Sequence, residues 1–171
     1  FMKTIGFIDL YISEWNANNY PKWIRQAAEA YGEEWKVAYV YAEEDVSPVD
    51  GRTTAAWCEA FGATACGSIR EVCEKADCLF ILAPSNPEVH EELAELPLKS
   101  GKPVYVDKPF APNGDAARRM FDLAAKYNTP LMSSSALRFG NELMELQQKN
   151  IGPLVVNTCD GGGNFPEYGI H

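Results

Sequence analysis

The sequence predicts an α/β protein with a doubly wound parallel sheet, and three features of the chain lead to this prediction. Short β-rich runs alternate about six times with longer segments whose apolar residues follow a helical period. Short strands joined by helical crossovers are typical of parallel sheets. The run DCLFIL at 77–82 is almost continuously apolar, as expected for a strand that helices cover on both faces.

The first half of the chain is expected to contain three strands and two helices. Strands are predicted at 3–9, 35–41 and 63–66, and helices at 19–31 and 54–61. An irregular segment is expected before the first helix. Asn18 and Asn19 are candidate caps for that helix, and Pro21 suits its first turn. Gly32 and Gly62 are expected to end the two helices.

The second half of the chain adds three strands and four helices. Strands are predicted at 77–82, 103–107 and 129–132, and helices begin near residues 68, 86, 113 and 142. Ser68 and Glu71 form a capping box at the start of the first of these helices. The buried stripe of the helix at 113–127 is predicted to comprise Ala117, Met120, Phe121 and Ala124.

The chain is expected to hold one domain and the beginning of another. Residues 1–150 are predicted to form the α/β domain. Residues 151–171 are predicted to begin a second, α+β domain, because 154–158 is strand-like and 160–164 is loop-like. A strand at this place has no obvious partner, so we expect a fragment of a longer protein or a shortened gene product.

Composition and charge exclude several classes of function. The 171 residues carry 24 acidic and 15 basic side chains, a formal net charge of −9. An acidic surface repels phosphate backbones, so no nucleic-acid partner is expected. No apolar run approaches the roughly 20 residues of a membrane span, so no membrane association is expected. The first residues lack the regions of a signal peptide, so a cytoplasmic location is expected.

Metal binding is not expected either. The five cysteines form no CxxC pair, and the chain has only two histidines, so no zinc-site spacing exists. The cysteines are therefore predicted to be reduced thiols, most of them packed as small apolar residues.

Ligands of doubly wound sheets bind at the carboxyl ends of the strands, near the point where the strand order reverses. The tripeptide Asp107-Lys108-Pro109 follows the predicted fifth strand. The Lys108 ammonium is expected to reach a hydroxyl, carbonyl or phosphate of a ligand, with Asp107 holding the lysine in place. The alternative is a surface salt bridge before a proline turn.

Two other strand ends carry candidate ligand-binding residues. The residues after the fourth strand begin a helix whose N-terminal N–H groups favour an anionic or polar group; they are Ala83, Pro84, Ser85 and Asn86. His90 is expected on the first turn of this helix, facing the same site, although a histidine on a helix is more often structural or merely exposed. Glu43, Glu44 and Asp45 follow the second strand, where an acid normally binds the adenosine ribose of NAD and repels the 2′-phosphate of NADP.

Three segments together resemble the glucose–fructose oxidoreductase, inositol dehydrogenase and MocA family, whose N-terminal domain has a Rossmann-type fold. They are 83–90 (APSNPEVH), 101–113 (GKPVYVDKPFAPN) and 133–139, which ends in Arg138 and Phe139. The middle segment is similar to the family's Glu-Lys-Pro signature, with Asp107 in place of glutamate. The order and spacing of these segments agree with the family from about Lys3 to Thr158.

The resemblance implies an NAD(P)-dependent oxidoreductase that acts on a sugar, polyol or related hydroxy compound. It implies that Lys108 contacts both cofactor and substrate, with the nicotinamide near His90. Residues 167–171 (EYGIH) are similar to a family Asp-x-Gly-x-His element. On that basis His171 is the predicted general acid/base, since its ordinary pKa of about 6.5 lies near working pH. The predicted catalytic residues are thus Asp107, Lys108, Glu167 and His171.

The cofactor is expected to be NAD or NADP, with NAD favoured. The residues predicted to bind it are Ile8, Asp9, Tyr11, Ile12, Glu43, Ala83, Pro84, Ser85, Asn86, His90, Lys108 and Arg138. A small-molecule substrate and a homo-oligomer are the expected partners, because the family's second domain supplies the substrate pocket and usually the oligomer interface.

The sequence departs from the family at the turn after the first strand. The family has Gly-x-Gly-x-x-Gly there, whereas this chain places Asp9, Tyr11 and Glu14 at the three glycine positions. Those glycines allow a tight turn and close approach of the backbone to the pyrophosphate. A phenol ring and two carboxylates are expected to crowd and repel a diphosphate, so cofactor binding is predicted to be weakened, rearranged or lost.

Two functions from different classes therefore remain open. The first is the NAD(P)-dependent oxidoreductase or its cofactor domain. The second is a non-catalytic small-molecule-binding or regulatory protein on the same fold, suggested by the loss of all three glycines, because a fold does not establish an activity. In the second case Tyr11, Trp15, Asn16 and Asn18 form either a new ligand surface or a loop packed on the sheet.

Overall fold

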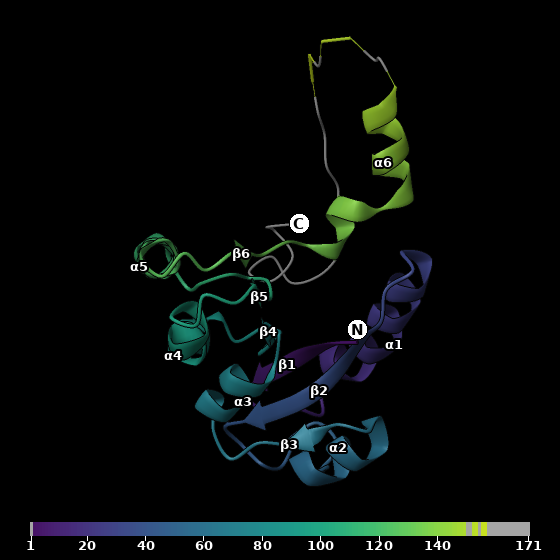
Figure 1. The fold of residues 1–171 in the computed structure, drawn as a ribbon. Coiled ribbons are helices and arrows are strands. Elements are labelled where there is room, and N and C mark those ends of the chain that lie inside the picture. The colour runs from purple at the N-terminus through teal and green to yellow at the C-terminus, as the bar shows by residue number, and fades with distance from the viewer. Residues whose placement is uncertain (1, 150–151, 154, 157–171) are drawn as a thin grey trace. The chain divides into compact units, whose positions relative to one another are not determined.

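Six parallel strands form a single sheet in the order β3-β2-β1-β4-β5-β6 (Figure 1). The structure is a computed structural model that describes residues 2–149, 152, 153, 155 and 156. The strands are β1 (Lys3–Asp9), β2 (Trp35–Ala42), β3 (Thr64–Ala65), β4 (Cys78–Ile81), β5 (Val104–Val106) and β6 (Leu131–Met132). The chain thus starts in the middle of the sheet, runs to one edge, and returns past β1 to the other. The predicted doubly wound sheet is confirmed.

Helices cover both faces of this sheet. They are α1 (Trp15–Ala30), α2 (Thr54–Phe61), α3 (Ile69–Lys75), α4 (Pro87–Leu98) and α5 (Gly114–Lys126). Helices α1 and α2 share one apolar cluster with one face of the sheet, and α3, α4 and α5 share a second cluster with the other face (Figure 1). Every predicted strand and helix in this region exists, although several ends differ by one to a few residues.

Strand β1 contributes to both clusters because successive side chains of a strand point to opposite faces. Ile5 and Phe7 belong to the cluster under α1 and α2, whereas Ile8 belongs to the cluster under α3, α4 and α5. The same alternation in β4 sends Leu79 and Ile81 to the second cluster. The nearly continuous apolar runs in the sequence follow from this two-sided burial.

Two residues outside the apolar clusters fix helix α3 on the sheet. Gly6 of β1 leaves room for the helix, because a Cβ at this position would overlap the Val72 side chain and touch the Cβ of Ala76. Lys102 caps the C-terminal end of α3, where its Nζ donates to the carbonyl oxygens of Cys73 at 2.6 Å and Ala76 at 2.5 Å. Carbonyls at a helix end have no partner within the helix, so this lysine satisfies them.

Helix α1 begins four residues earlier than the predicted 19–31, and no long irregular segment precedes it. The reason is Glu14, whose side chain accepts hydrogen bonds from the backbone N–H groups of Asn16 and Ala17 and so caps the helix at Trp15. Pro21 therefore lies inside the helix and not in its first turn.

The buried stripe of α5 also differs from the predicted one. Ala116, Met120 and Ala124 are its buried residues, while Phe121 is 54% exposed. Residues 116, 120 and 124 are spaced by four, so they lie on one helix face. The prediction was right for Met120 and Ala124 and wrong for Ala117, which is only half-buried, and for Phe121. Phe121 instead packs its ring at 5.0 Å from that of Phe110.

The chain divides into two compact units, Phe1–Ser133 and Ser134–His171. The second contains a 3-10 turn at Ala136–Phe139 and helix α6 (Asn141–Gln148), which has no buried residue. The strand expected at 154–158 lies largely outside the described residues; Val155 and Val156 are described, belong to no strand and are exposed. The predicted domain boundary at residue 150 stays a prediction.

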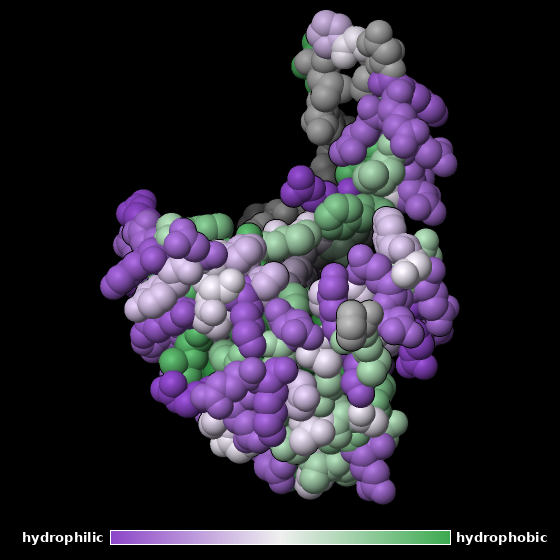
Figure 2. Space-filling model, in the orientation of Figure 1, coloured by the Kyte–Doolittle hydropathy of each residue, from purple (hydrophilic) through white to green (hydrophobic). Residues whose placement is uncertain are grey.

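Two predicted absences concern the described part of the chain. No helix there is long and apolar enough to cross a membrane. Its four cysteines are free thiols, and it contains no cluster of three or more acidic, histidine or cysteine side chains arranged to hold a metal ion. Polar side chains cover much of the face seen in Figure 2.

Replacing Gly6 with alanine is expected to lower the free energy of unfolding by about 1–3 kcal/mol, because overpacking forces the strand and α3 apart. Urea denaturation measures this change. Gly114→Ala is the control, since a Cβ at Gly114 meets no atom within 4 Å. In a Val72→Ala background the effect of Gly6→Ala should shrink; an undiminished loss would contradict the proposed contact.

Candidate functional site

The strand order reverses between β1 and β4, and ligands of doubly wound sheets bind at the carboxyl ends of such strands. We call this place, with the turn 10–14 and the segments that follow β4 and β5, the switch point. Asp9 ends β1, Ala83 follows β4 and Asp107 follows β5 directly. The sheet thereby brings together residues that are 74 and 98 positions apart in the chain.

Asp9 links the ends of β1 and β4. Its Oδ1 accepts hydrogen bonds from the backbone N–H of Leu10 at 2.7 Å and of Ala83 at 3.0 Å. Its side chain is 1% exposed, and no described residue donates a hydrogen bond to its Oδ2. Burial raises the pKa of Asp9 well above its ordinary value, and the nearby charge of Glu14 raises it further.

Glu14 occupies the N-terminus of α1. Its carboxylate accepts from the backbone N–H of Asn16 at 2.6 Å and from that of Ala17, and the residue is 4% exposed. Burial raises the pKa of Glu14 to about 7; the two backbone hydrogen bonds oppose this shift, and the charge of Asp107 adds to it. The carboxylate thus uses two of the N–H groups with which a helix N-terminus binds an anion.

Tyr11 lies in the same turn. Partial burial and the charges of Asp9, Glu14 and Glu44 raise the pKa of Tyr11. Against this shift, the side chain of Asn86, the residue that precedes α4, lowers the pKa of the Tyr11 phenol. Two of the three side chains at the glycine positions of the family motif, Asp9 and Glu14, therefore accept backbone hydrogen bonds at the switch point.

The segment after β4 has an unusual backbone. Ala83 and Ser85 have φ values of 39° and 65°, in the left-handed region that is costly for residues with a side chain. His90 holds this segment, because its Nε2 lies 2.9 Å from the carbonyl oxygen of Leu82 and its Nδ1 3.1 Å from that of Phe110. The ring is fully buried, so in this structure His90 supports the backbone, and its predicted place beside the ligand stays a prediction.

Asp107 is the centre of a second polar network. Its carboxylate accepts from Asn16 Nδ2 at 2.7 Å and from the hydroxyls of Tyr105 at 3.1 Å and Tyr20 at 3.4 Å. Burial raises the pKa of Asp107, opposed by Tyr105 and by the backbone and charge of Lys108. Lys108 itself is half-buried and precedes a cis peptide bond to Pro109.

Asn16, Tyr20 and Tyr105 were not assigned to Asp107 from the sequence. Tyr105 lies two residues before Asp107 on the same strand face, a spacing that the sequence does contain. Asn16 and Tyr20 are more than 85 residues away from Asp107, and they reach it only because α1 begins at Trp15. With the predicted start at residue 19, Asn16 lay outside the helix and Tyr20 at its beginning, so the sequence did not place either of them beside Asp107.

The acids after β2 have different roles. Glu43 and Glu44 are exposed, and their backbone N–H groups donate to the carbonyls of Asp9 and Leu10. Asp45 instead accepts from the backbone N–H of Thr54 at the start of α2. Glu43 and Glu44 thus remain available to a ligand, whereas Asp45 is used in the fold.

The other predicted site residues are distributed over the chain. Ile8 and Ile12 are fully buried apolar side chains, so only their backbone faces the turn. Arg138 lies in the second compact unit, exposed, with its guanidinium 5.9 Å from the ring centre of Phe139. Glu167 and His171 lie outside the described residues.

The switch point fits a dinucleotide in part. The strand order, the acids after β2 and the lysine after β5 are where a dinucleotide needs them. The diphosphate position does not fit, because Glu14 already caps the N-terminus of α1. No step of a reaction can be derived through a cofactor seated in this arrangement.

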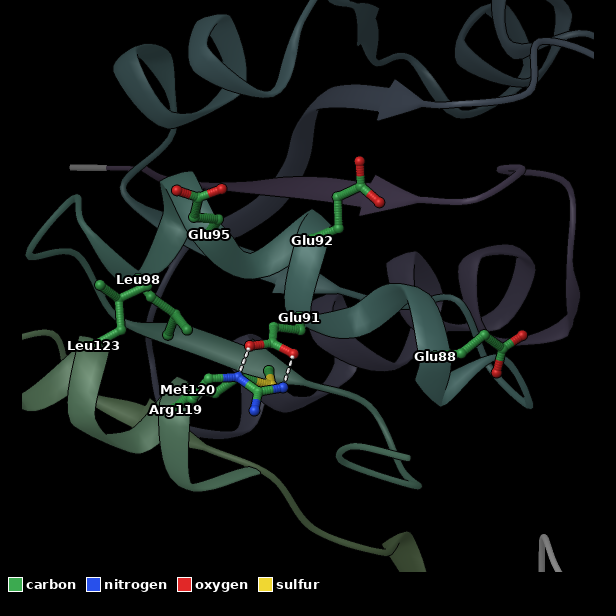
Figure 3. A pocket seen from close by; sticks show the side chains of 8 residues that line it. All are labelled: Glu88, Glu91, Glu92, Glu95, Leu98, Arg119, Met120 and Leu123. Atoms are coloured by element: carbon green, nitrogen blue, oxygen red, sulfur yellow. Dashed lines mark hydrogen bonds and ion pairs between the residues drawn. The ribbon is translucent and has the colours of Figure 1, made fainter. Parts of the chain in front are cut away.

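A groove of about 630 Å³ lies elsewhere, between α4 and α5 (Figure 3). Its lining residues are Glu88, Glu91, Glu92, Glu95, Leu98, Arg119, Met120 and Leu123. Arg119 spans it with two hydrogen bonds of 2.6 and 2.8 Å to Glu91. None of these lining residues belongs to the switch point, so the groove is not part of the candidate site.

The buried carboxyl of Glu14 makes the stability of the chain depend on pH. Its pKa is raised in the folded state, so the stabilisation present at low pH is lost as pH rises from about 4.5 through about 7. We expect this residue to lower the free energy of unfolding by up to about 3 kcal/mol between pH 5 and pH 8. Glu14→Gln should remove this pH-dependent part of the free energy of unfolding, as measured by urea denaturation. Glu29→Gln, at the exposed far end of α1, should leave the pH dependence unchanged. Equal pH dependence in both variants would refute the assignment.

Comparison with solved structures identifies the same fold in known oxidoreductases. An NAD-binding oxidoreductase from Klebsiella pneumoniae superposes with a TM-score of 0.70 at 20% identity, over 86% of this chain and 38% of that protein. A UDP-N-acetylglucosamine 3-dehydrogenase from Acidithiobacillus ferrooxidans superposes with a TM-score of 0.67 at 18% identity, over 89% of this chain and 43% of that protein. Biliverdin reductase from Synechocystis, in complex with biliverdin and NADP⁺, superposes with a TM-score of 0.63 at 18% identity, over 85% of this chain and 42% of that protein. The chain spans about two fifths of the length of these proteins.

Sequence comparison supplies the family. No curated protein matches the chain significantly. The sequence model of the oxidoreductase family with an NAD-binding Rossmann fold, the Gfo/Idh/MocA family, matches residues 26–135, which is more than half of the chain. The match begins after the turn 10–14, so the altered glycine positions lie outside it. The chain belongs to the Gfo/Idh/MocA family of NAD(P)-binding oxidoreductases.

Proposed function

We propose that this chain is the cofactor-binding part of an NAD(P)-dependent oxidoreductase that acts on a sugar, polyol or related hydroxy compound. The observation that carries the proposal is the Asp107–Lys108 pair at the carboxyl end of β5, beside the point where the strand order reverses. Three side chains hold the Asp107 carboxylate, so the backbone that presents Lys108 is fixed. A fixed cation at a ligand-binding edge suits the recognition of a hydroxyl or carbonyl oxygen.

The substrate class has independent support. Among the proteins with the same fold, one is a dehydrogenase of UDP-N-acetylglucosamine and another was solved with NADH and UDP-GlcNAcA. At this low identity the likeness concerns the fold, so the sugar-like substrate of this chain is part of the proposal. Lys108 is the proposed contact for the reacting oxygen, and Asp107 is the positioning residue behind it. Glu167 and His171 keep their predicted roles beyond the described residues.

NAD is the preferred cofactor in this proposal. Glu43 and Glu44 are exposed directly after β2, where an acid accepts from the adenosine ribose. Two carboxylates at this place repel the additional phosphate of NADP. The proposed partners remain a small-molecule substrate and a second copy of the protein, and the proposed location is the cytoplasm.

The second candidate function is a non-catalytic small-molecule-binding or regulatory protein on the same fold. The observation that favours it is that the carboxyls of Asp9 and Glu14 accept backbone hydrogen bonds at the proposed diphosphate position. The two candidates differ in one measurable property, the binding of a dinucleotide.

Titration with NADH and NADPH tests the proposed function. We expect saturable binding of both, with NADH tighter than NADPH because of Glu43 and Glu44. Quenching of the four tryptophans, of which Trp15 directly follows Glu14, reports the binding. The double variant Glu43→Gln, Glu44→Gln should reduce the difference in affinity between NADH and NADPH. Absence of binding up to millimolar concentration would refute the oxidoreductase and favour the second candidate.

Replacing Lys108 with alanine is expected to reduce turnover by about 10²–10⁴-fold, the usual effect of losing a polar group that acts on the reacting atoms. Turnover is measured as NADH formation with a panel of sugars, polyols and their nucleotide derivatives. Lys126→Ala, at the exposed end of α5, is the matched control and should keep full turnover. Unchanged turnover in Lys108→Ala would contradict the assigned role.

A further inference from the structure

Strand-to-helix turns of dinucleotide-binding domains leave the first N–H groups of the helix free for a diphosphate. In this chain the groups of Asn16 and Ala17 already donate to the carboxylate of Glu14. The residue is almost completely buried, so the carboxylate is part of the folded turn and not a side chain at its surface. An anion from the chain itself thus stands in the position of the anion of the ligand.

The neighbouring side chains reinforce this arrangement. Tyr11 is part of the same turn, and its phenol is close enough to Asp9 and Glu14 for their charges to raise its pKa. Asp9 accepts a hydrogen bond from the backbone N–H of Ala83, and its Oδ2 is buried without a donor from any described residue. A diphosphate entering here meets two carboxyls and a phenol where the family motif has three hydrogen atoms.

We propose that Glu14 is an intramolecular competitor of the dinucleotide diphosphate: its carboxylate closes the N-terminus of α1, and binding of NAD(H) or NADP(H) requires Glu14 to leave this position for solvent. The proposal rests on the proposed function, because it concerns the same dinucleotide site. It adds an autoinhibitory contact that sets the affinity of the site.

Displacement of Glu14 has a definite pH dependence. Burial raises the pKa of the closed carboxyl to about 7, whereas in solvent the carboxyl returns toward its ordinary value near 4.5. Binding that expels Glu14 therefore releases a proton below pH 7, and affinity rises with pH, by at most about tenfold per unit, before it levels off. If Glu14 stayed in place and only repelled the diphosphate, affinity would fall as pH rises, so the sign separates the two mechanisms.

Other titratable groups face Glu14, and their contributions to the pH dependence of binding must be separated from that of Glu14. Asp9 and Tyr11 face it from the turn, Tyr20 from α1 and Asp107 from the end of β5. The pKa of each of these groups is raised, as the pKa of Glu14 is. The comparison that isolates Glu14 is the difference in pH dependence between the unmodified chain and variants at residue 14.

The experiment is calorimetric titration with NADH and NADPH from pH 5.5 to 8.5, in buffers of different ionisation enthalpy so that proton release is measured directly. Glu14→Gly restores the residue of the family motif and keeps an acceptable helix cap. It should bind at least tenfold more tightly at pH 6 and lose most of the proton release. Glu14→Gln keeps an uncharged side chain of the same shape, and its affinity should stay near the low-pH value of the unmodified chain at every pH.

Glu29→Gln is the matched control on α1 and should behave like the unmodified chain. Circular dichroism verifies that each variant is folded, and Glu14→Gln keeps the test valid if the glycine variant is not. If the unmodified chain binds NADH but Glu14→Gly binds it no more tightly at pH 6, or Glu14→Gln keeps the pH dependence of the unmodified chain, the inference is overturned while the proposed function stands. If no variant binds either dinucleotide at any pH, the proposed function fails, and the inference fails with it.

Discussion

Strand β1 is covered on both faces and paired on both edges, and this constraint governs the rest of the structure. Its neighbours in the sheet are β2 and β4, so both halves of the fold meet at it. Helix α3 lies against its one glycine and α1 against its other face. Whatever follows Asp9 at the end of this strand is therefore enclosed by protein on several sides, and polar side chains there must find partners.

The partners they find explain the electrostatics of the switch point. Asp9, Glu14 and Asp107 are three buried carboxyls at one edge of the sheet, and burial raises the pKa of each. Backbone N–H groups, an amide and two phenols donate hydrogen bonds to these carboxyls. In relatives that bind dinucleotides the ligand itself brings the negative charge to such donors. Here the chain brings it, which couples occupancy of the site to proton binding.

The chain thus retains one part of its family's pattern and departs from another. The family match covers residues 26–135, which contain β2 through β6 and the Asp107-Lys108-Pro109 segment. The turn 10–14 lies outside it and has its own set of interactions. His90 has a structural part within the matched region, because its ring lies within hydrogen-bond distance of the carbonyl oxygens of Leu82, Ala83 and Phe110. The architecture of a dinucleotide site and its readiness to bind are separate properties of this sequence.

The sequence by itself determined the sheet, the alternation of strands and helices, and the edge at which ligand-binding residues gather. These follow from apolar periodicity and short connections, which are local properties: the continuous run of β4 and the positions of α2 and α4 needed no knowledge of distant residues. It also located the departure at Asp9, Tyr11 and Glu14. What only the tertiary structure decided was the use of these side chains. Glu14 caps α1 through the N–H groups of Asn16 and Ala17, a local contact that the periodic pattern does not mark. His90 became a buried support and Asn16 a hydrogen-bond donor to Asp107, because each needs an acceptor that folding brings from elsewhere in the chain. Hydrogen bonds between residues some 90 positions apart leave no periodic signal, so the start of α1 and the closure of the turn emerged only from the packed sheet.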